Sequence, residues 1–293
     1  MGSPAQPSAA QRERHPRCQY GSSAPARRTC SSTASTASTA MAPQYRVVMV
    51  RHGESEWNLQ NLFCGWYDAK LSDIGREEAY ASAKMLQEAG LEFDVCHTSL
   101  LSRANDTLDV ILREIGQPNL PVYKSWRLNE RHYGALTGFN KLQTAQKYGA
   151  EQVQIWRRSY DIPPPPIEED HKYYSAIVNN PKFTQDLSKD EIPRTESLKT
   201  TLQRVIPYWE DVIAPQIRQG KRVLIVTHGT SLRGLVKHVQ QMSDEVIVKL
   251  NLPNAIPFYY DLDENLQTVG PLRFLADEET VRREMEKVAS IGK

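Results

Sequence analysis

Cysteine is scarce in this sequence, and no stretch of it is continuously apolar for long. The 293 residues include four cysteines, Cys18, Cys30, Cys64 and Cys96. These are too few and too scattered for a disulfide framework or a zinc site, so we expect four free thiols in a reducing compartment. The longest apolar runs, such as residues 47–50 and 223–226, are far shorter than the roughly 18 residues that a spanning helix needs. The sequence therefore predicts a protein that is not inserted in a membrane.

An excess of charge of one sign is also missing. The chain has 36 basic and 35 acidic residues, but residues 1–40 hold five arginines and a single acid, Glu13. The remainder is therefore slightly acidic, which argues against a broad surface for nucleic acid or anionic membranes. We predict neither kind of partner. An anion site must then be built locally, from a few converging cations in a cleft.

The beginning of the chain differs in composition from the rest. Residues 1–43 are rich in Ser, Thr, Ala, Pro and Arg, and residues 31–40 contain only Ser, Thr and Ala. Such a segment cannot bury enough apolar surface to offset its ordering entropy, so we predict disorder. A passive extension upstream of an alternative start at Met41 is favoured over an organelle-targeting peptide, because an amphipathic stripe is missing. We expect a cytoplasmic protein, with mitochondrial targeting by residues 1–40 as the alternative.

From residue 44 onward, apolar runs alternate with stretches of helical periodicity. Strands are predicted at residues 46–50, 93–98 and 222–227, and helices at residues 75–89, 102–115, 195–213 (kinked at Pro207) and 231–242. This alternation predicts one α/β domain, 44–293, whose mostly parallel central sheet has helices on both faces in three layers. Residues 137–194, with prolines at 163–166, predict a helical and loop insertion that walls a site.

Two histidines follow two of the predicted strands. Arg51-His52-Gly53-Glu54 offers an imidazole nucleophile beside a cation, and a glycine that lets backbone N–H groups approach an anion. By itself this pattern more often marks a structural histidine. His228 also leaves a strand, and the helix that follows it favours an anion at its N-terminus.

Together the two histidines predict one anion site at the carboxyl ends of the strands. There His228, protonated or hydrogen-bonding, would stabilise a transferring phosphoryl group. No metal is expected, because the sequence has no His-x-x-x-His or cysteine-rich spacing.

Five longer motifs carry a resemblance to a known family. They are RHGESEWN at residues 51–58, GWYD at 65–68, WRLNERHYG at 126–134, WRRSY at 156–160 and HGTSLRG at 228–234. The chain resembles, from residue 45 to about residue 293, the 2,3-bisphosphoglycerate-dependent phosphoglycerate mutases of the histidine phosphatase superfamily. The resemblance implies a homodimeric glycolytic enzyme that interconverts 3-phosphoglycerate and 2-phosphoglycerate. It also implies a phosphohistidine at His52, primed by 2,3-bisphosphoglycerate as cofactor.

The resemblance assigns roles to individual positions. It implies that His52 is phosphorylated, that Glu130 is general acid and base, and that His228 stabilises the transferring group. The positions that would hold the phosphate are Arg51, Asn58, Arg103, Gly229 and Thr230, and those for the rest of the substrate are Cys64, Gly65, Tyr133, Lys141, Arg157 and Arg158. The simpler alternatives are an ordinary ion pair of Glu130 with Arg127 or Arg131, and a solvated surface pair at residues 157–158.

Thr230 departs from the family pattern, which usually has Asn there. If that amide contacts phosphate, its loss costs on the order of 1 kcal/mol and slows turnover. A non-catalytic or weakly active phosphate-binding paralogue is therefore the alternative. Gly65 favours the mutase, since the resemblance associates a bulkier residue with bisphosphoglycerate synthesis; minor bisphosphoglycerate mutase or phosphatase activity stays open. Residues 277–293 predict an amphipathic, mobile tail that, by the resemblance, helps close the site.

Overall fold

The two predicted strands that end at the histidines pair directly with each other. In the computed structural model, which describes Gly2 and residues 43–290, β1 (Tyr45–Arg51) lies parallel to β4 (Val223–Thr227). The pairing brings Arg51 opposite Thr227, so His52 and His228 emerge side by side at one edge of the sheet. The predicted extension, apart from Gly2 and Pro43, lies outside the described residues.

Four more strands extend the sheet on either side of this pair. They are β2 (Val95–Thr98), β3 (Val122–Lys124), β5 (Phe258–Leu262) and β6 (Arg273–Phe274). The order is β3-β2-β4-β1-β5-β6, with β2 and β3 parallel to their neighbours and β5 and β6 antiparallel. The prediction of a mostly parallel sheet is confirmed.

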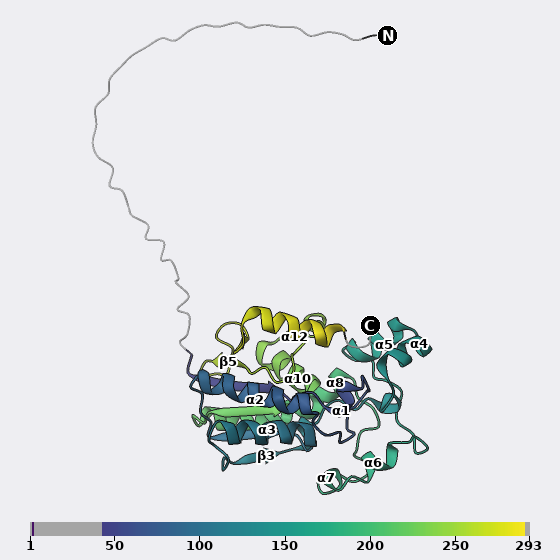
Figure 1. Cartoon of the computed structure of the whole chain (residues 1–293), viewed down its shortest axis with the longest axis horizontal. Helices are drawn as coiled ribbons and strands as arrows, with labels where there is room; N and C mark the ends of the chain where they lie inside the picture. The colour runs from purple at the N-terminus through teal and green to yellow at the C-terminus, as the bar shows by residue number, and fades with distance from the viewer. Residues whose placement is uncertain (1, 3–42, 291–293) are drawn as a thin grey trace, which may run out of the picture. The chain divides into compact units, whose positions relative to one another are not determined.

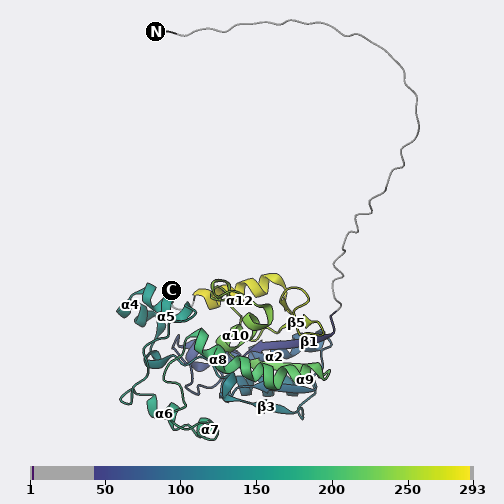
Figure 2. The ribbon, with the colours of Figure 1, turned by 180° about the vertical axis from the view of Figure 1, so that it is seen from behind.

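Helices cover both faces of this sheet (Figures 1 and 2). The main ones are α2 (Asp73–Glu88), α3 (Ser102–Glu114), α8 (Leu198–Tyr208), α9 (Ala214–Arg218) and α10 (Gly229–Gln240). Val48 and Val50 of β1 pack against α2 and α3, whereas Val47 and Met49 pack against α8, α9 and α10. Alternate residues of one strand thus face two apolar cores, which explains its continuous apolar run.

The predicted helix over residues 195–213 begins at Leu198, continues to Arg218 and changes its winding on the way. Ser197 begins it with a capping box, and α8 ends at Tyr208. A π-helical turn, Trp209–Ile213, then leads into α9. This turn lies between Pro207 and Pro215, neither of which has an N–H to donate to the regular helical ladder. The predicted irregularity at Pro207 therefore takes the form of a π turn.

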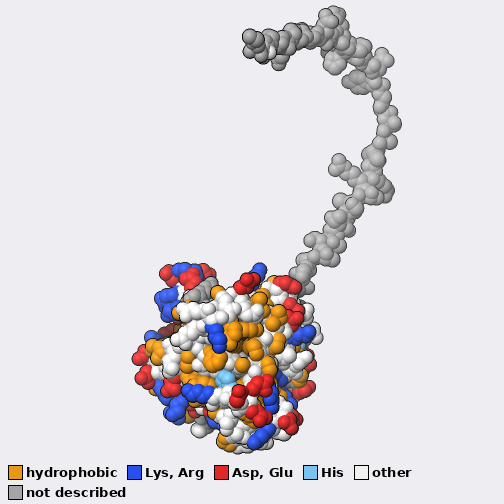
Figure 3. Space-filling model, turned by 90° about the vertical axis from the view of Figure 1, so that its right-hand side faces the viewer, with side chains coloured by type: hydrophobic (Ala, Val, Ile, Leu, Met, Phe, Trp, Pro, Cys, Tyr) orange, Lys and Arg blue, Asp and Glu red, His pale blue; other side chains and the backbone are white. Residues whose placement is uncertain are grey.

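Residues 137–194 form a helical and loop insertion. Its helices are α4 (Lys141–Tyr148), α5 (Ala150–Arg158), α6 (Tyr174–Val178) and α7 (Pro181–Thr184). The proline segment, residues 163–166, is bound to the 3₁₀ turn Gly134–Leu136, because the N–H of Ala135 donates to the carbonyl of Pro165. Figure 3 views this side of the molecule, where hydrophobic side chains reach the surface among charged ones; Phe139, Leu142 and Tyr148 are exposed.

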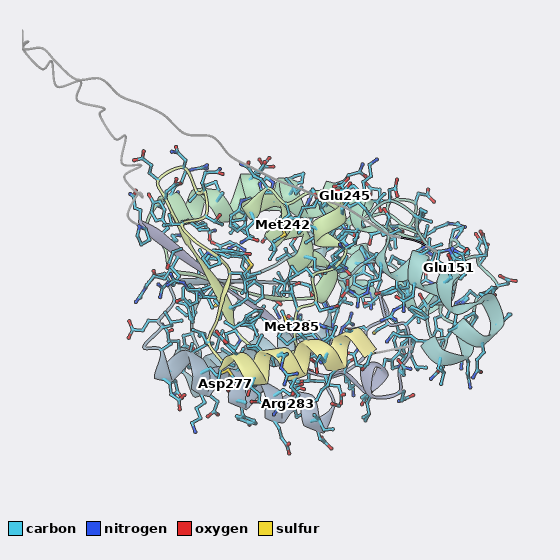
Figure 4. All side chains as sticks on the ribbon, turned by 90° about the horizontal axis from the view of Figure 1, so that it is seen from above. Glu151, Met242, Glu245, Asp277, Arg283 and Met285 are labelled. Atoms are coloured by element: carbon cyan, nitrogen blue, oxygen red, sulfur yellow. The ribbon has the colours of Figure 1, made fainter. Side chains whose placement is uncertain are left out.

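The predicted C-terminal tail is a helix, α12 (Glu278–Ser290). Figure 4 looks onto it from above, with Asp277 at its beginning. Its far end lies beside α5 (Figures 1 and 2). The remaining short helices are α1 (Glu56–Leu59), η1 (Trp126–Leu128), η2 (Gly134–Leu136) and α11 (Asp244–Ile247). No helix among the described residues has the length and apolar character that crossing a membrane requires.

Candidate active site

A cavity of about 100 Å³ lies where β1 ends and α10 begins. Its wall carries one carboxylate, that of Glu130, and seven cations: Arg51, Arg103, Arg131, Lys141, Arg157, Arg158 and Arg233. Every residue that the sequence singled out for the site lines this cavity, with the exception of His228. Residues that are far apart in the chain, from Arg51 to Val288, therefore converge on one small, strongly cationic space.

His52 is buried at the end of β1 and held by two contacts. Its Nδ1 is 2.6 Å from the carbonyl oxygen of Gly53, and its Nε2 is 3.3 Å from Nε of Arg103. Because a carbonyl only accepts, we assign the proton to Nδ1 and the lone pair to Nε2. Burial, and then the charges of Arg103 and Arg51, hold the pKa of His52 well below its usual value. His52 is therefore a neutral imidazole whose Nε2 has the lone pair of a nucleophile.

His228 lies directly behind His52, with the two ring centroids 4.9 Å apart. Its Nε2 is 2.7 Å from the hydroxyl of Ser99, and its buried Nδ1 has no partner among the described residues. Burial, and then the charges of Arg103 and other neighbours, hold the pKa of His228 well below its usual value. Of its two predicted states, the hydrogen-bonding one agrees with this direction, because burial beside cations disfavours a second proton on the ring.

Arg51 and the beginning of α10 form one part of the wall. Nη1 of Arg51 donates to the carbonyl of Leu252 at 2.8 Å, and its buried Nε has no partner among the described residues. Burial lowers the pKa of this guanidinium. Gly229 lies against it so closely that an added Cβ would be 3.3 Å from Nε. The glycine therefore keeps the helix N-terminus and the cation beside the same space.

Arg103 and Asn58 lie on the same side. Nη1 and Nη2 of Arg103 donate to the carbonyls of Tyr67 and Gly65, at 3.1 and 2.8 Å. These bonds fix the guanidinium beside His52. Oδ1 of Asn58 accepts from the hydroxyl of Ser55 at 2.8 Å in the capping box of α1. Its amide nitrogen is thus the group left for an anion.

Glu130 is held by backbone groups. Its Oε1 accepts from the N–H of Arg131 at 2.7 Å and from the N–H of Thr230 at 3.2 Å. The guanidinium groups of Arg127 and Arg131 lie over neighbouring aromatic rings instead of pairing with this carboxylate. The predicted alternative of an ordinary ion pair is therefore wrong. Thr230 contributes to the site through its backbone as well as its buried side chain.

Three cations reach the cavity from the insertion. Burial, and then the charge of Arg157, lowers the pKa of Lys141 to about 7. Burial likewise lowers the pKa of Arg157 to about 10 and lowers that of Arg158. The alternative of a solvated surface pair at residues 157–158 is therefore wrong, since both side chains are largely withdrawn from solvent. Tyr133, also predicted to contact substrate, lines the cavity from the end of the segment that carries Glu130.

Gly65 lies close to the backbone of the segment that carries Glu130. Its φ is +56°, and an added Cβ would be 3.0 Å from the backbone oxygen of Arg131 and from the backbone nitrogen of Tyr133. A larger residue would strain its own backbone and push the segment that carries Glu130. A glycine at this position thus keeps the cavity open to its full width.

The cysteines carry no disulfide among the described residues. Cys64, which lines the cavity, and Cys96 are buried free thiols. The thiol of Cys64 donates to the carbonyl of Tyr67, and burial raises its pKa. Cys18 and Cys30 lie outside the described residues.

Sequence reasoning missed several lining residues, most notably Arg233. This buried side chain donates from Nη2 to the carbonyl of Ile247 at 2.9 Å, and burial, then the charge of Arg158, lowers its pKa to about 9. A signal existed, because Arg233 lies four residues after Gly229 on the same face of α10. The others are Leu62, Arg131, Leu250, Asn251, Leu252 and Val288. Val288 brings α12 to the cavity, at the place expected of the C-terminal tail.

The electrostatics of the cavity favour a multiply charged anion. Three of its buried guanidinium nitrogens, Nε of Arg51, Arg131 and Arg233, have no partner within the described part of the chain. An anion would supply the acceptors that these donors require. The described residues contain no cluster of three or more His, Cys, Asp or Glu that could hold a metal ion. The absence of a metal remains an expectation.

Known structures share the architecture described above. A mycobacterial glucosyl-3-phosphoglycerate phosphatase is 22% identical, with a TM-score of 0.56 and 74% of this chain and 92% of that one covered. A putative α-ribazole-5′-P phosphatase from Escherichia coli is 20% identical, with a TM-score of 0.58 and coverages of 80% and 98%. YhfR from Bacillus stearothermophilus is 20% identical, with a TM-score of 0.56 and coverages of 78% and 94%. At these identities the likeness shows the α/β fold.

The sequence itself matches one family over most of its described length. Residues 47–179 and 178–269 match the histidine phosphatase superfamily, branch 1. The matched region begins in β1, beside His52, and contains Glu130, His228 and the insertion. The chain therefore belongs to branch 1 of the histidine phosphatase superfamily.

Proposed function

We propose that the protein is a 2,3-bisphosphoglycerate-dependent phosphoglycerate mutase, working through a phosphohistidine at His52. Membership of the superfamily makes it an enzyme of phosphoryl transfer or hydrolysis. One observation carries the finer proposal: a neutral His52 and the carboxylate of Glu130 share the wall of a cavity of only about 100 Å³. A small, strongly cationic space of this kind suits a compact phosphorylated acid.

In the first half-reaction, Nε2 of His52 attacks one phosphorus of a bound bisphosphorylated acid. An N–P bond forms while the P–O bond to the substrate breaks, and Glu130 gives its proton to the departing oxygen. Arg51 and Arg103 hold the phosphoryl oxygens, and His228, in contact with the ring of His52, stabilises the transition state by hydrogen bonding.

In the second half-reaction, the free hydroxyl of a bound monophosphorylated acid takes the phosphoryl group from His52. Glu130, now ionised, removes the proton of this hydroxyl while the N–P bond breaks and the new P–O bond forms. Lys141, Arg157 and Arg158 hold the carboxylate and the second anionic group, so the small acid stays bound while it turns. Val288, at the end of α12, helps exclude water that would hydrolyse the phosphohistidine.

The residues present fit 2,3-bisphosphoglycerate as the priming donor. Two phosphates and a carboxylate match a wall of seven cations, three of which keep an unpartnered buried Nε. When bound, this molecule supplies the phosphoryl group that first charges His52. A homodimer and a cytoplasmic location belong to the same proposal, and both rest on the resemblance of the sequence.

Gly65 supports a mutase over an enzyme that mainly makes bisphosphoglycerate or hydrolyses it. A larger side chain there would push the backbone of residues 131–133 and reduce the room in which the acid turns. The ratio of monophosphoglycerate isomerised to bisphosphoglycerate formed and phosphate released, measured on one purified sample, separates the three activities. Thr230 motivates the alternative of a non-catalytic phosphate-binding paralogue, which predicts none of these products.

The proposal is tested by following phosphate onto His52. Full-length protein incubated with labelled 2,3-bisphosphoglycerate is expected to acquire one acid-labile phosphoryl group, and His52→Ala is expected to acquire none and to lose mutase activity by on the order of 10⁴-fold or more. His238→Ala is a matched control, because this histidine lies on α10 and its salt-bridge partner is Glu210. A wild-type enzyme that turns over without ever acquiring the label contradicts the mechanism.

A further inference from the structure

The segment that carries Glu130 lacks regular structure of its own. It leaves the single 3₁₀ turn η1 at Leu128 and enters the turn η2 at Gly134. Residues 129–133 between these turns belong to neither a helix nor a strand. Their buried carbonyls must find partners elsewhere, and a carboxylate that transfers protons needs a fixed backbone beneath it.

Arg204, on α8, provides partners for two of these carbonyls and for two in η1 before them. Nη1 donates to the carbonyls of Arg127 and Asn129, both at 2.8 Å, and Nη2 donates to the carbonyl of Glu130 at 3.0 Å. The remaining N–H groups are directed at Glu196, with Nε 2.7 Å from Oε1 and Nη2 2.8 Å from Oε2. Nη1 also lies 3.4 Å from the carbonyl of Trp126, so one guanidinium binds four carbonyls and one carboxylate and all of its donors are used.

Glu196 extends the same arrangement to the other side of Glu130. Its Oε2 also accepts from the N–H of His132 at 2.8 Å, and its own N–H donates to the carbonyl of His132 at 2.9 Å. The loop is therefore held on both sides of the carboxylate, at residues 129 and 130 by Arg204 and at residue 132 by Glu196.

The pair is buried and self-neutralising. The side chains of Arg204 and Glu196 are only 6% and 4% exposed. Burial alone would raise the pKa of Glu196, but the charge and hydrogen bonds of Arg204 hold that pKa below its usual value. Neither side chain lines the cavity, and the polar atoms of both are taken up by each other and by the backbone of the loop. Lysine could not replace the arginine, because an ammonium group lacks five donors in a planar fork.

We propose that Arg204 and Glu196 are positioning residues that hold the Glu130 carboxylate in place for proton transfer. The inference rests on the proposed function. It states that loss of the pair slows proton transfer by Glu130, whereas loss of a purely structural ion pair would affect all steps alike. It predicts that disturbing the pair slows those reactions in which Glu130 must supply a proton. Reactions whose leaving group needs no proton should be spared.

Two phosphoryl donors separate these cases. With bisphosphoglycerate as donor, the leaving group is the alkoxide of monophosphoglycerate, which requires a proton, whereas acetyl phosphate, which is also small, releases acetate without one. In rapid-quench measurements with full-length Arg204→Lys, phosphorylation of His52 by bisphosphoglycerate is expected to slow about 100-fold. Phosphorylation by acetyl phosphate is expected to change by less than about 3-fold, since His52 and the arginines around it are untouched.

Glu196→Gln and Arg222→Lys complete the design. Glu196→Gln keeps the size of the side chain and, if Arg204→Lys fails to fold, tests the same pair; it is expected to show the same donor selectivity. Arg222 forms an equivalent fork with Asp94, with bonds of 3.1 and 2.8 Å, at the opposite ends of the strands. Arg222→Lys is therefore expected to leave both rates unchanged.

The outcomes are distinct. Equal loss with both donors in the variants of the pair, or no loss with either, overturns the inference, because the pair would then hold the fold or do nothing for catalysis. A wild-type enzyme that never forms phosphohistidine from bisphosphoglycerate overturns the proposed function instead, whatever the variants do.

Discussion

The two sides of the cavity are built in different ways. The strand wall consists of Arg51, His52, Arg103 and Gly229, which stand where β1, α3 and α10 meet the edge of the sheet. His52 and the two arginines of this wall are each bonded to a backbone carbonyl or to one another. The insertion wall consists of Lys141, Arg157 and Arg158, on short helices outside the sheet. Burial depresses the pKa of all three.

The difference separates two tasks. Fixed geometry at the ends of strands suits the chemical step, which must be aligned before the substrate arrives. The buried cations of the insertion have lost part of their hydration, which disfavours their charged form. A bound anion stabilises that charged form again, so these cations gain most from an anionic ligand. Variants of the strand wall should therefore change mainly kcat, and variants of the insertion wall mainly KM.

Among the variants that leave His52 in place, the largest loss of kcat is expected at His228, next to the strand wall. His228→Gln should lower kcat about 100- to 1,000-fold, because it removes a stabilising imidazole in contact with His52, and should leave KM within about 3-fold. Steady-state kinetics, together with the rate of His52 phosphorylation, provide the measurement. A raised KM with normal kcat would show that His228 binds substrate. It would contradict the proposal that the strand wall acts mainly on kcat and the insertion wall mainly on KM.

An intermediate effect is expected from the insertion wall. Lys141→Met should raise KM about 30-fold and change kcat little, since one charge-assisted contact to the substrate is lost. Lys84→Met is the control, because that lysine is exposed and forms only a surface pair with Glu88 on α2.

The same lysine predicts a pH dependence. With a pKa of about 7, Lys141 is charged below that pH and neutral above it, so wild-type kcat/KM should fall as the pH rises through about 7. In Lys141→Met this decline should be absent. An identical decline in the variant would assign the titration to another group.

The smallest effect on activity is expected at Thr230, in the first turn of α10. Thr230→Asn should raise kcat up to about 5-fold, because the amide adds a donor beside the phosphate while the backbone bond to Glu130 is kept. The mutase assay and a melting curve of the variant are sufficient. Lower activity with an unchanged melting temperature would mean that the threonine is adapted to this cavity.

The meeting of His52 and His228 was predictable from the sequence, because two buried strands followed by histidines place both at one edge of a parallel sheet. The helices α2, α3 and α10 were also predictable from their apolar periodicity. β3, β5 and β6 were not anticipated, since β3 and β6 have only three and two residues and β5 alternates between buried and half-buried residues. Short edge strands depend on the neighbours that they pair with, and a single sequence does not show these.

The site was less predictable away from its motifs. Arg204 lies within an apolar helical stretch, and its function follows from carbonyls that are more than 70 positions away in the chain. No local pattern reports such a contact. The neutral state of His228 was not predictable either, because it results from burial among cations brought together only by folding.

The pairing of β1 with β4 also constrains how the protein is made. Val47 leaves the ribosome early, yet its partner Val223 is synthesised only after the helices of the insertion and α8. Until then the apolar edge of β1 has no parallel neighbour, and the nascent chain carries an unpaired strand that is prone to aggregate. Chains truncated before β4 should therefore have no activity and should depend on chaperones to stay in solution.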